Sequence, residues 1–189
     1  MSEHEALGAA LLGRARRSIE SQLGLDVGLA VDERGALPEM AAPGACFVTL
    51  TQHGHLRGCI GSLEAYRALR DDVWHNAQAA AFRDPRFAPI TADEWPTVRV
   101  EVSLLSTPER LQIADEHDLC AQLRPGIDGV IFQAAGRRST FLPQVWDQLP
   151  DPTIFMAHLK EKAGVRASYW GDDVQIWRYG VQKWKEGAP

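Results

Sequence analysis

The sequence predicts an α+β fold with a mainly antiparallel β-sheet flanked by helices. Three observations point to this class: two hairpin patterns, three stretches of helical periodicity, and no regular βαβ alternation of the kind that builds a parallel sheet. The chain has 189 residues, of which 45% are hydrophobic. That length is typical of one domain, and it is enough to bury a core without disulfide or metal staples.

The chain begins with a predicted helix and a predicted hairpin. Apolar residues recur about every four positions over 7–23, and Gly24 and Gly28 are expected to end this helix. Residues 45–60 predict a hairpin, because ACFVTLT is apolar and β-branched, QHGH supplies a turn and LRGCIG returns.

A second helix and a half-buried strand are predicted next. The helical stripe over 69–80 should stop before Pro85, because proline restricts the preceding residue and lacks a backbone donor. In VRVEVSLLS, apolar and polar residues then alternate, which is typical of a strand with one buried face. One parity holds Val98, Val100, Val102 and Leu104, and the other holds Arg99, Glu101 and Ser103.

The remaining elements are a short helix, a second hairpin, a third long helix and a strand. The short helix is expected over 115–123, and the hairpin over 129–143 with its turn at Gly136. Proline is favoured at the first position of a helix and glycine just after its end, so the third helix is predicted over 152–164. The final strand is predicted over 173–181.

Composition argues against several classes of function. The 20 Lys and Arg residues are interspersed with 25 Asp and Glu residues, for a net charge of −5, which argues against nucleic-acid binding. No apolar run approaches the length of about 18 residues that a membrane-spanning helix needs, and the charged start is unlike a signal peptide. We therefore expect a cytoplasmic protein with no nucleic-acid or membrane partner.

The segment LRGCIG at 56–61 carries the clearest chemical pattern. In a regular strand His55, Arg57 and Cys59 would share one face, and a positive neighbour raises the thiolate fraction that a reactive cysteine needs. Gly58 and Gly61 flank the thiol, and glycine in a strand often marks a bulge or a close approach. The alternative is that Cys59 is a small buried apolar residue, as free cysteines usually are.

The other thiols and the histidines are assigned no chemistry. The three cysteines are odd in number and widely spaced, so we expect free thiols, with Cys46 and Cys120 in the core. A metal cluster of His53, His55 and Cys59 lacks an evident fourth ligand, so no metal site is predicted. The sequence assigns no cofactor.

LRGCIG and several later segments together resemble the AMMECR family. The segments that carry this resemblance are AAAFRDPRFAPIT at 79–91, EVSLLS at 101–106, GIDGV at 126–130, RRSTFLPQVW at 137–146, LKEKAG at 159–164 and IWRYGVQKWKE at 176–186. The match is closest to the bacterial and archaeal branch, protein A of the AmmeMemoRadiSam system. That branch is associated with a Memo-like protein and a radical-SAM protein.

The resemblance implies a single AMMECR-type domain over 1–189, with its core at about 5–186, built as two lobes or subdomains with a cleft between them near LRGCIG. It attaches no firm enzymatic activity. Its motifs single out Cys59 and Glu101 as catalytic candidates, with ligand-binding candidates Arg57, Arg86, Ser103 and Arg138. Asp84 and Lys162 fall in the same motifs.

Each of these residues also has a structural interpretation. Asp84 can end a helix and pair with Arg86 on the surface. Glu101 and Ser103 lie opposite the valines, which normally means solvent; if that face lines the cleft, Glu101 becomes a candidate general base or an orienter of the motif arginine. Arg138 at a hairpin can be an edge charge that discourages strand pairing, or part of an anion site.

Two functions follow from the resemblance. In the first, the protein binds or handles a small anionic molecule in a cleft centred on Arg57 and Cys59, and acts with the Memo-like and radical-SAM proteins. In the second, it is a non-catalytic adaptor or regulatory subunit of that system. A reactive thiol favours the first, and an inert thiol beside an exposed apolar patch favours the second.

Overall fold

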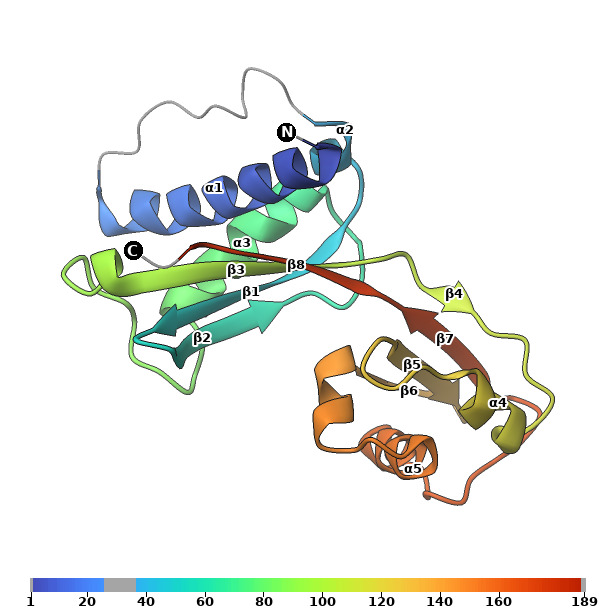
Figure 1. Cartoon of the computed structure of the whole chain (residues 1–189). Coiled ribbons are helices and arrows are strands. Elements are labelled where there is room, and N and C mark those ends of the chain that lie inside the picture. The colour runs from blue at the N-terminus through green and yellow to red at the C-terminus, as the bar shows by residue number, and fades with distance from the viewer. Residues whose placement is uncertain (1, 26–36, 188–189) are drawn as a thin grey trace. The chain divides into compact units, whose positions relative to one another are not determined.

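The computed structural model describes residues 2–25 and 37–187. The chain forms two compact units, which are described separately. The first unit comprises residues 1–105 and 182–189, and the second unit comprises residues 106–181 (Figure 1). Both contain helices and a four-stranded sheet, and the strand pairs with a defined register are antiparallel, which confirms the predicted α+β class.

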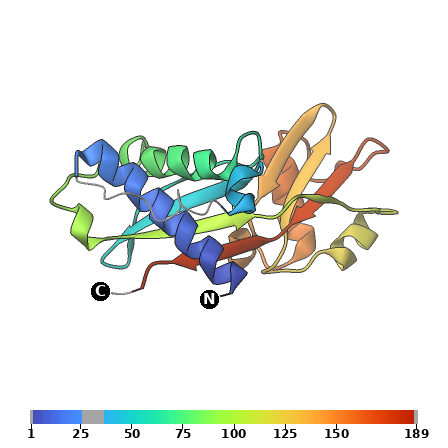
Figure 2. The same cartoon turned by 90° about the horizontal axis from the view of Figure 1, so that it is seen from above.

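The first unit is a sheet with strand order β2-β1-β3-β8, and α1 and α3 lie together on one of its faces (Figures 1 and 2). Its elements are α1 (Glu3–Leu23), α2 (Pro38–Ala41), β1 (Ala45–Gln52), β2 (His55–Gly61), α3 (Leu69–Phe82), a 3-10 helix (Trp95–Thr97), β3 (Val98–Leu105) and β8 (Val181–Lys185).

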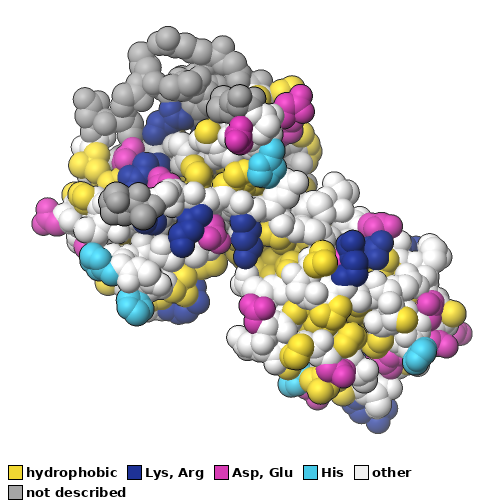
Figure 3. Space-filling view, viewed as in Figure 1, with side chains coloured by type: hydrophobic (Ala, Val, Ile, Leu, Met, Phe, Trp, Pro, Cys, Tyr) yellow, Lys and Arg dark blue, Asp and Glu magenta, His cyan; other side chains and the backbone are white. Residues whose placement is uncertain are grey.

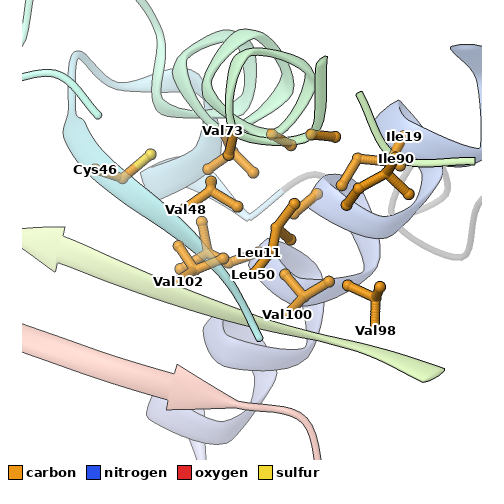
Figure 4. Close-up of a cluster of buried hydrophobic side chains, with 14 of the residues drawn as sticks. Leu11, Ile19, Cys46, Val48, Leu50, Val73, Ile90, Val98, Val100 and Val102 are labelled. Atoms are coloured by element: carbon orange, nitrogen blue, oxygen red, sulfur yellow. The ribbon is translucent and has the colours of Figure 1, made fainter. Parts of the chain in front are cut away.

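The core of the first unit lies between this sheet and the two helices. Val48 and Leu50 of β1 and the valines of β3 point toward Leu11 and Ile19 of α1 (Figure 4). The alternation predicted for VRVEVSLLS is confirmed over 98–102, where the three valines are buried. Beyond Val102 it fails, because Ser103 and Leu105 are buried and Leu104 is half-buried. The residues of opposite parity lie on the other side of the sheet. We call this side, turned away from α1 and α3, the outer face.

The helix ends follow the predicted signals where they are described. A capping box joins Ser2 and Glu5 at the start of α1, and Gly24 ends the helix in the left-handed conformation that glycine adopts without strain. Gly28, the second expected terminator, lies outside the described residues. Helix α3 ends at Phe82, before Asp84 and Pro85, as predicted.

The second unit has strand order β4-β7-β5-β6 with α5 packed beside β6. Its core includes Phe155 of α5, stacked on Trp146 with ring centroids 3.7 Å apart. Ala135 and Gly136 both have positive φ, which is typical of the tight turn predicted for this hairpin. The elements are β4 (Glu109–Arg110), α4 (Glu116–Gln122), β5 (Gly129–Ala134), β6 (Arg137–Phe141), a 3-10 helix (Pro143–Asp147), α5 (Pro152–Lys162) and β7 (Gln175–Tyr179).

The final strand predicted over 173–181 is present as β7, but the prediction missed a second strand that follows it. The chain forms β7 in the second sheet, breaks at Gly180 and continues as β8 in the first sheet. The break is held by Ser106, whose N–H donates to the carbonyl of Gly180 at 2.9 Å and whose Oγ accepts from the N–H of Gly180 at 2.8 Å. In the sequence, Gly180 is the only sign that the chain passes from one sheet to the other at this point.

Glu186 anchors the chain after β8. Its carboxylate accepts from the Nε of Arg16 at 2.7 Å and from the N–H of Val100 at 2.9 Å. It therefore ties the end of the chain to both α1 and β3. In residues 2–25 and 37–187, no helix is long and apolar enough to cross a membrane.

Candidate functional site

Cys59 and Glu101 lie in one row across the first sheet. Thr49 of β1 pairs with Cys59 of β2 on one side and with Glu101 of β3 on the other. Side chains of directly paired residues project from the same face, so thiol, hydroxyl and carboxylate all lie on the outer face. The Oγ1 of Thr49 is 3.3 Å from the Sγ of Cys59. The sequence did not single out Thr49, because a threonine in a strand carries no distinctive signal.

The next row on the outer face holds Gly61, Phe47 and Ser103. A Cβ on Gly61 would lie 2.2 Å from the ring of Phe47, so the aromatic ring covers the glycine. Ser103 is buried and Phe47 is half-buried. The outer face thus places an aromatic ring and a second hydroxyl beside the row that contains Cys59.

A β-bulge at Arg57 changes the faces on which the preceding residues of β2 lie. Gly58 pairs with Leu50, but Leu56 pairs with Thr51, so Arg57 is the extra residue on β2. Leu56 therefore takes the parity of Cys59, and His55, which pairs with Gln52, takes the opposite one. The prediction that His55, Arg57 and Cys59 all share one face was wrong. The alternation of a strand fails wherever an unpaired residue is inserted.

Arg57 is held by a carboxylate that the sequence did not identify. Its guanidinium donates to Glu94 at 3.2 Å and to the carbonyl of Ala88 at 2.8 Å. The pKa of Glu94 is lowered, first by the N–H of Thr91 and then by Arg57. Arg57 thus braces the loop between α3 and β3, and its carboxylate partner is Glu94 rather than Glu101.

Asp84 and Arg86 form a clasp on the backbone of Cys59. Asp84 accepts from the N–H of Cys59 at 2.9 Å, and Nη2 of Arg86 donates to the Cys59 carbonyl at 3.3 Å. In an antiparallel pair every second residue directs its N–H and C=O away from the partner strand, and β2 has no strand on that side. The two side chains therefore bind these groups of Cys59 as a neighbouring strand would.

The clasp is also an ion pair. The carboxylate of Asp84 is buried, and it lies 2.7 Å from Nη2 of Arg86. Arg86 holds the pKa of the Asp84 carboxyl well below its usual range, because a hydrogen-bonded guanidinium favours the ionised form. Asp84 in turn raises the pKa of Arg86, with a smaller contribution from Cys59. Asp84 thus follows the end of α3, as its structural interpretation predicted, and it also holds the backbone of the motif strand.

Gly58 brings α3 close to the motif strand. A Cβ at this position would lie 2.1 Å from the carbonyl oxygen of Ala80 in α3. The glycine of the motif therefore serves a close approach of backbone to backbone, one of the roles that its place in a strand predicted.

A buried polar network fixes the segment that follows the motif. The carboxylate of Asp72 accepts from the N–H of Cys46 at 2.9 Å, from the hydroxyl of Ser62 at 2.7 Å and from Arg67 at 2.8 Å. Asn76, one turn later on α3, donates to Asp72 at 2.9 Å. Neither Asp72 nor Asn76 was singled out from the sequence, because α3 carries several other polar residues.

The other two thiols lie in core surroundings. Cys46 is fully buried, and burial raises the pKa of its thiol well above its usual value, with a further contribution from Asp72. Cys120 packs against the core of the second unit, where burial also raises its thiol pKa. All three cysteines are free, as predicted. Within the described parts of the chain, no three His, Cys, Asp or Glu side chains gather as a metal site would require.

Arg138 and Lys162 belong to the second unit. Arg138 is an exposed residue of β6, opposite Gln133. Lys162 donates to the carbonyl of Thr140 at 2.9 Å and lies 5.0 Å from the centre of the Phe141 ring. The row formed by Cys59, Thr49 and Glu101 is built without them.

Several known proteins are similar to this chain in sequence. The profile of the AMMECR1 family matches residues 12–184. A protein from Aeropyrum pernix is 35% identical over 191 residues, covering 98% of this chain and 81% of the relative. One from Saccharolobus solfataricus is 34% identical over 198 residues, covering 98% and 84%.

One solved structure is similar to this chain in fold. The crystal structure of an uncharacterized protein from Pyrococcus horikoshii matches with a TM-score of 0.77 at 29% identity, covering 96% of this chain and 92% of that one. The family profile spans nearly the whole chain, including LRGCIG and the motifs that follow it. The resemblance predicted from those motifs is confirmed, and the chain belongs to the AMMECR1 family.

Proposed function

We propose that this protein binds a small molecule on the outer face of the first sheet and presents Cys59 and Glu101 to it. The observation that carries the proposal is the row in which Thr49 stands between the thiol and the carboxylate, with its Oγ1 3.3 Å from Sγ. A thiol, a hydroxyl and a carboxylate side by side can supply a nucleophile, a hydrogen bond and a proton acceptor. The clasp of Asp84 and Arg86 fixes the backbone of the thiol-bearing residue.

The cellular setting is part of the same proposal. The protein acts in the cytoplasm, together with a Memo-like protein and a radical-SAM protein, as the AmmeMemoRadiSam branch of its family suggests. The expected cleft near LRGCIG would shield the bound molecule from water, and this remains a prediction.

Alkylation rates test whether the thiol is available for chemistry. Cys59 is half-buried, whereas burial raises the thiol pKa of both Cys46 and Cys120. We expect Cys59 to react fastest with iodoacetamide in the folded protein at neutral pH, because burial disfavours the reactive thiolate at the other two cysteines. Peptide mass spectrometry would give the three rates. A Cys59 rate no higher than those of Cys46 and Cys120 would contradict a chemical role.

Two arginine variants sharpen this measurement. Arg86 contacts the Cys59 carbonyl, whereas Arg57 is paired with Glu94. Arg86→Gln should therefore slow alkylation of Cys59, because a neighbouring positive charge favours the thiolate. Arg57→Gln serves as the matched control and should leave the rate unchanged. The reverse order would mean that the motif arginine, and not the clasp, governs the thiol.

An adaptor function is the second candidate, and one surface favours it. Leu63 and Tyr66 are 42% and 68% exposed in the segment 62–68. Ser62 and Arg67 of this segment donate hydrogen bonds to the buried carboxylate of Asp72. A rigid segment that exposes an aromatic side chain is typical of a binding hot spot, because little ordering entropy is lost on association. Hydrophobic side chains also gather over α5 of the second unit (Figure 3), where Ile154 is 50% exposed.

Titration against a Memo-like protein from the same organism tests the adaptor candidate. We expect association at tens of micromolar or tighter by calorimetry, and Tyr66→Ala should weaken it by about tenfold or more. Ile154→Ala, which removes an exposed apolar side chain from the second unit, is the control. Absence of association, or equal effects of the two variants, would contradict docking through the segment 62–68.

A further inference from the structure

Two lysines of β8 lie on the outer face beside the proposed site. Gly180 pairs with Ser106 and Glu186 with Val100, so β8 runs antiparallel to β3 and the strand pairing is regular between those points. This register places Lys183 opposite Ser103 and Lys185 opposite Glu101. The row that contains Cys59 is therefore extended by Lys185, and the row that contains Phe47 by Lys183.

The packing of Trp184 confirms that Lys183 and Lys185 lie on the outer face. A Cβ on Gly8 of α1 would lie 2.2 Å from the ring of Trp184, so this tryptophan points toward the helices. Its neighbours Lys183 and Lys185 must then project from the outer face, because side chains alternate along a strand. Both lysines are exposed, and within the described residues neither makes a hydrogen bond or an ion pair.

The arginines predicted to bind an anion are already occupied. Arg57 is paired with Glu94, and Arg86 with Asp84. Arg99, which shares the outer face with Glu101, donates to the carbonyl of Val98 at 3.0 Å and to that of Pro96 at 3.2 Å. The lysine ammonium groups are therefore the cations of this face that are ready to contact a ligand.

The charge of the outer face is opposite to that of the whole protein. The chain has a net charge of −5, yet among the described strand residues of this face there are three cations, Lys183, Lys185 and Arg99, and one carboxylate, Glu101. A local field of reversed sign concentrates ligands of the opposite charge. Beside the lysines lie the hydroxyls of Thr49 and Ser103, which can donate hydrogen bonds to an anion, and the ring of Phe47, on which a flat or apolar body can rest.

We propose that the ligand of the outer face is a small organic anion, a carboxylate or a phosphate, whose charged group is bound by Lys183 and Ser103 and whose body lies on Phe47 next to Cys59. This inference rests on the proposed function and names the class of molecule that the site takes. The cations come from the last strand of the sheet and not from the LRGCIG arginine.

Amide chemical shifts of the isotope-labelled full chain test this assignment. The probes are benzoate, phenyl phosphate and benzylammonium, which share a ring and differ in the charged group. We expect benzoate or phenyl phosphate at millimolar concentration to shift the amides of 47–49, 101–103 and 183, and benzylammonium to leave them unchanged. Whichever of the two anions binds more tightly indicates whether the natural ligand is a carboxylate or a phosphate.

Charge variants of the same chain separate a built site from a general charge effect. Lys183→Gln should weaken binding of the anion by about tenfold, which corresponds to about 1.4 kcal/mol. Glu101→Gln should strengthen binding of the anion, because a neighbouring like charge is removed. Arg70→Gln removes an exposed positive charge from α3, on the other side of the sheet, and should have no effect.

The outcomes distinguish this inference from the function on which it rests. If benzylammonium alone shifts the same residues, the ligand is not an anion, but the proposal of a ligand site on the outer face is retained. Shifts scattered over the surface, or equal weakening by Lys183→Gln and Arg70→Gln, would overturn the assignment to Lys183. If no probe shifts these residues and Cys59 is also inert to alkylation, both the inference and the proposed function fail.

Discussion

Gly58→Ala is expected to lower the free energy of unfolding by about 3 kcal/mol, at the upper end of the usual cost of overpacking. The added Cβ would lie 2.1 Å from the carbonyl oxygen of Ala80, and a helix backbone cannot move aside as a flexible side chain can. Urea denaturation followed by circular dichroism measures the change.

Gly13→Ala is the matched control for this substitution. Gly13 lies inside α1, and a Cβ there would meet nothing within 4 Å. Alanine should raise the stability by about 0.5 to 1 kcal/mol, because glycine is a poor helix former. If Gly58→Ala is as stable as the wild type, α3 does not pack against the motif strand as described.

Asp84→Asn is expected to cost about 2 kcal/mol at neutral pH, because it weakens charge-assisted hydrogen bonds to Arg86 and to the backbone of Cys59. The cost should also depend on pH. The folded-state pKa of Asp84 is lowered, so its ionised form stabilises the native state above the unfolded pKa of about 3.9, and this contribution is lost as the pH falls through the folded value. The difference between wild type and variant should therefore shrink below about pH 4.

Asp93→Asn is the control for the pH experiment. Asp93 is an exposed aspartate in the same loop between α3 and β3. Its substitution should change the stability by less than about 0.5 kcal/mol at any pH, as is usual for surface positions. If the Asp84→Asn difference stays constant from neutral to acid pH, the ion pair with Arg86 does not contribute to folding.

Much of the fold could be predicted from the sequence, because the period of apolar residues is set by the elements themselves. Val98, Val100 and Val102 identified the buried face of β3, and the proline at position 85 located the end of α3. Glu101 was correctly placed on the opposite face by the same alternation.

The site could be predicted only in part, since its geometry depends on exceptions to that alternation. The bulge at Arg57 reverses the parity of the residues before it, and no residue type marks the insertion. Glu94 pairs with Arg57 across 37 positions of chain, a distance over which a sequence pattern carries no information about contact. The lysines of β8 were overlooked because a single strand was predicted where the chain forms two, in different sheets.

Arg86 shows how one motif can carry two roles. Its pairing with Asp84 was predicted as a surface contact after a helix. The same pair closes the open edge of β2 at Cys59, where unsatisfied backbone groups would otherwise invite pairing with another strand.

Native mass spectrometry of the full chain, purified without added ligand, tests the central claim most directly. We expect a discrete small-molecule mass that remains bound under native conditions and is released on denaturation. Thr49→Val and Lys183→Gln should each lose that mass, whereas Arg70→Gln should retain it. A wild-type protein that carries no bound molecule, or a molecule retained equally by all three variants, would contradict a ligand site on the outer face.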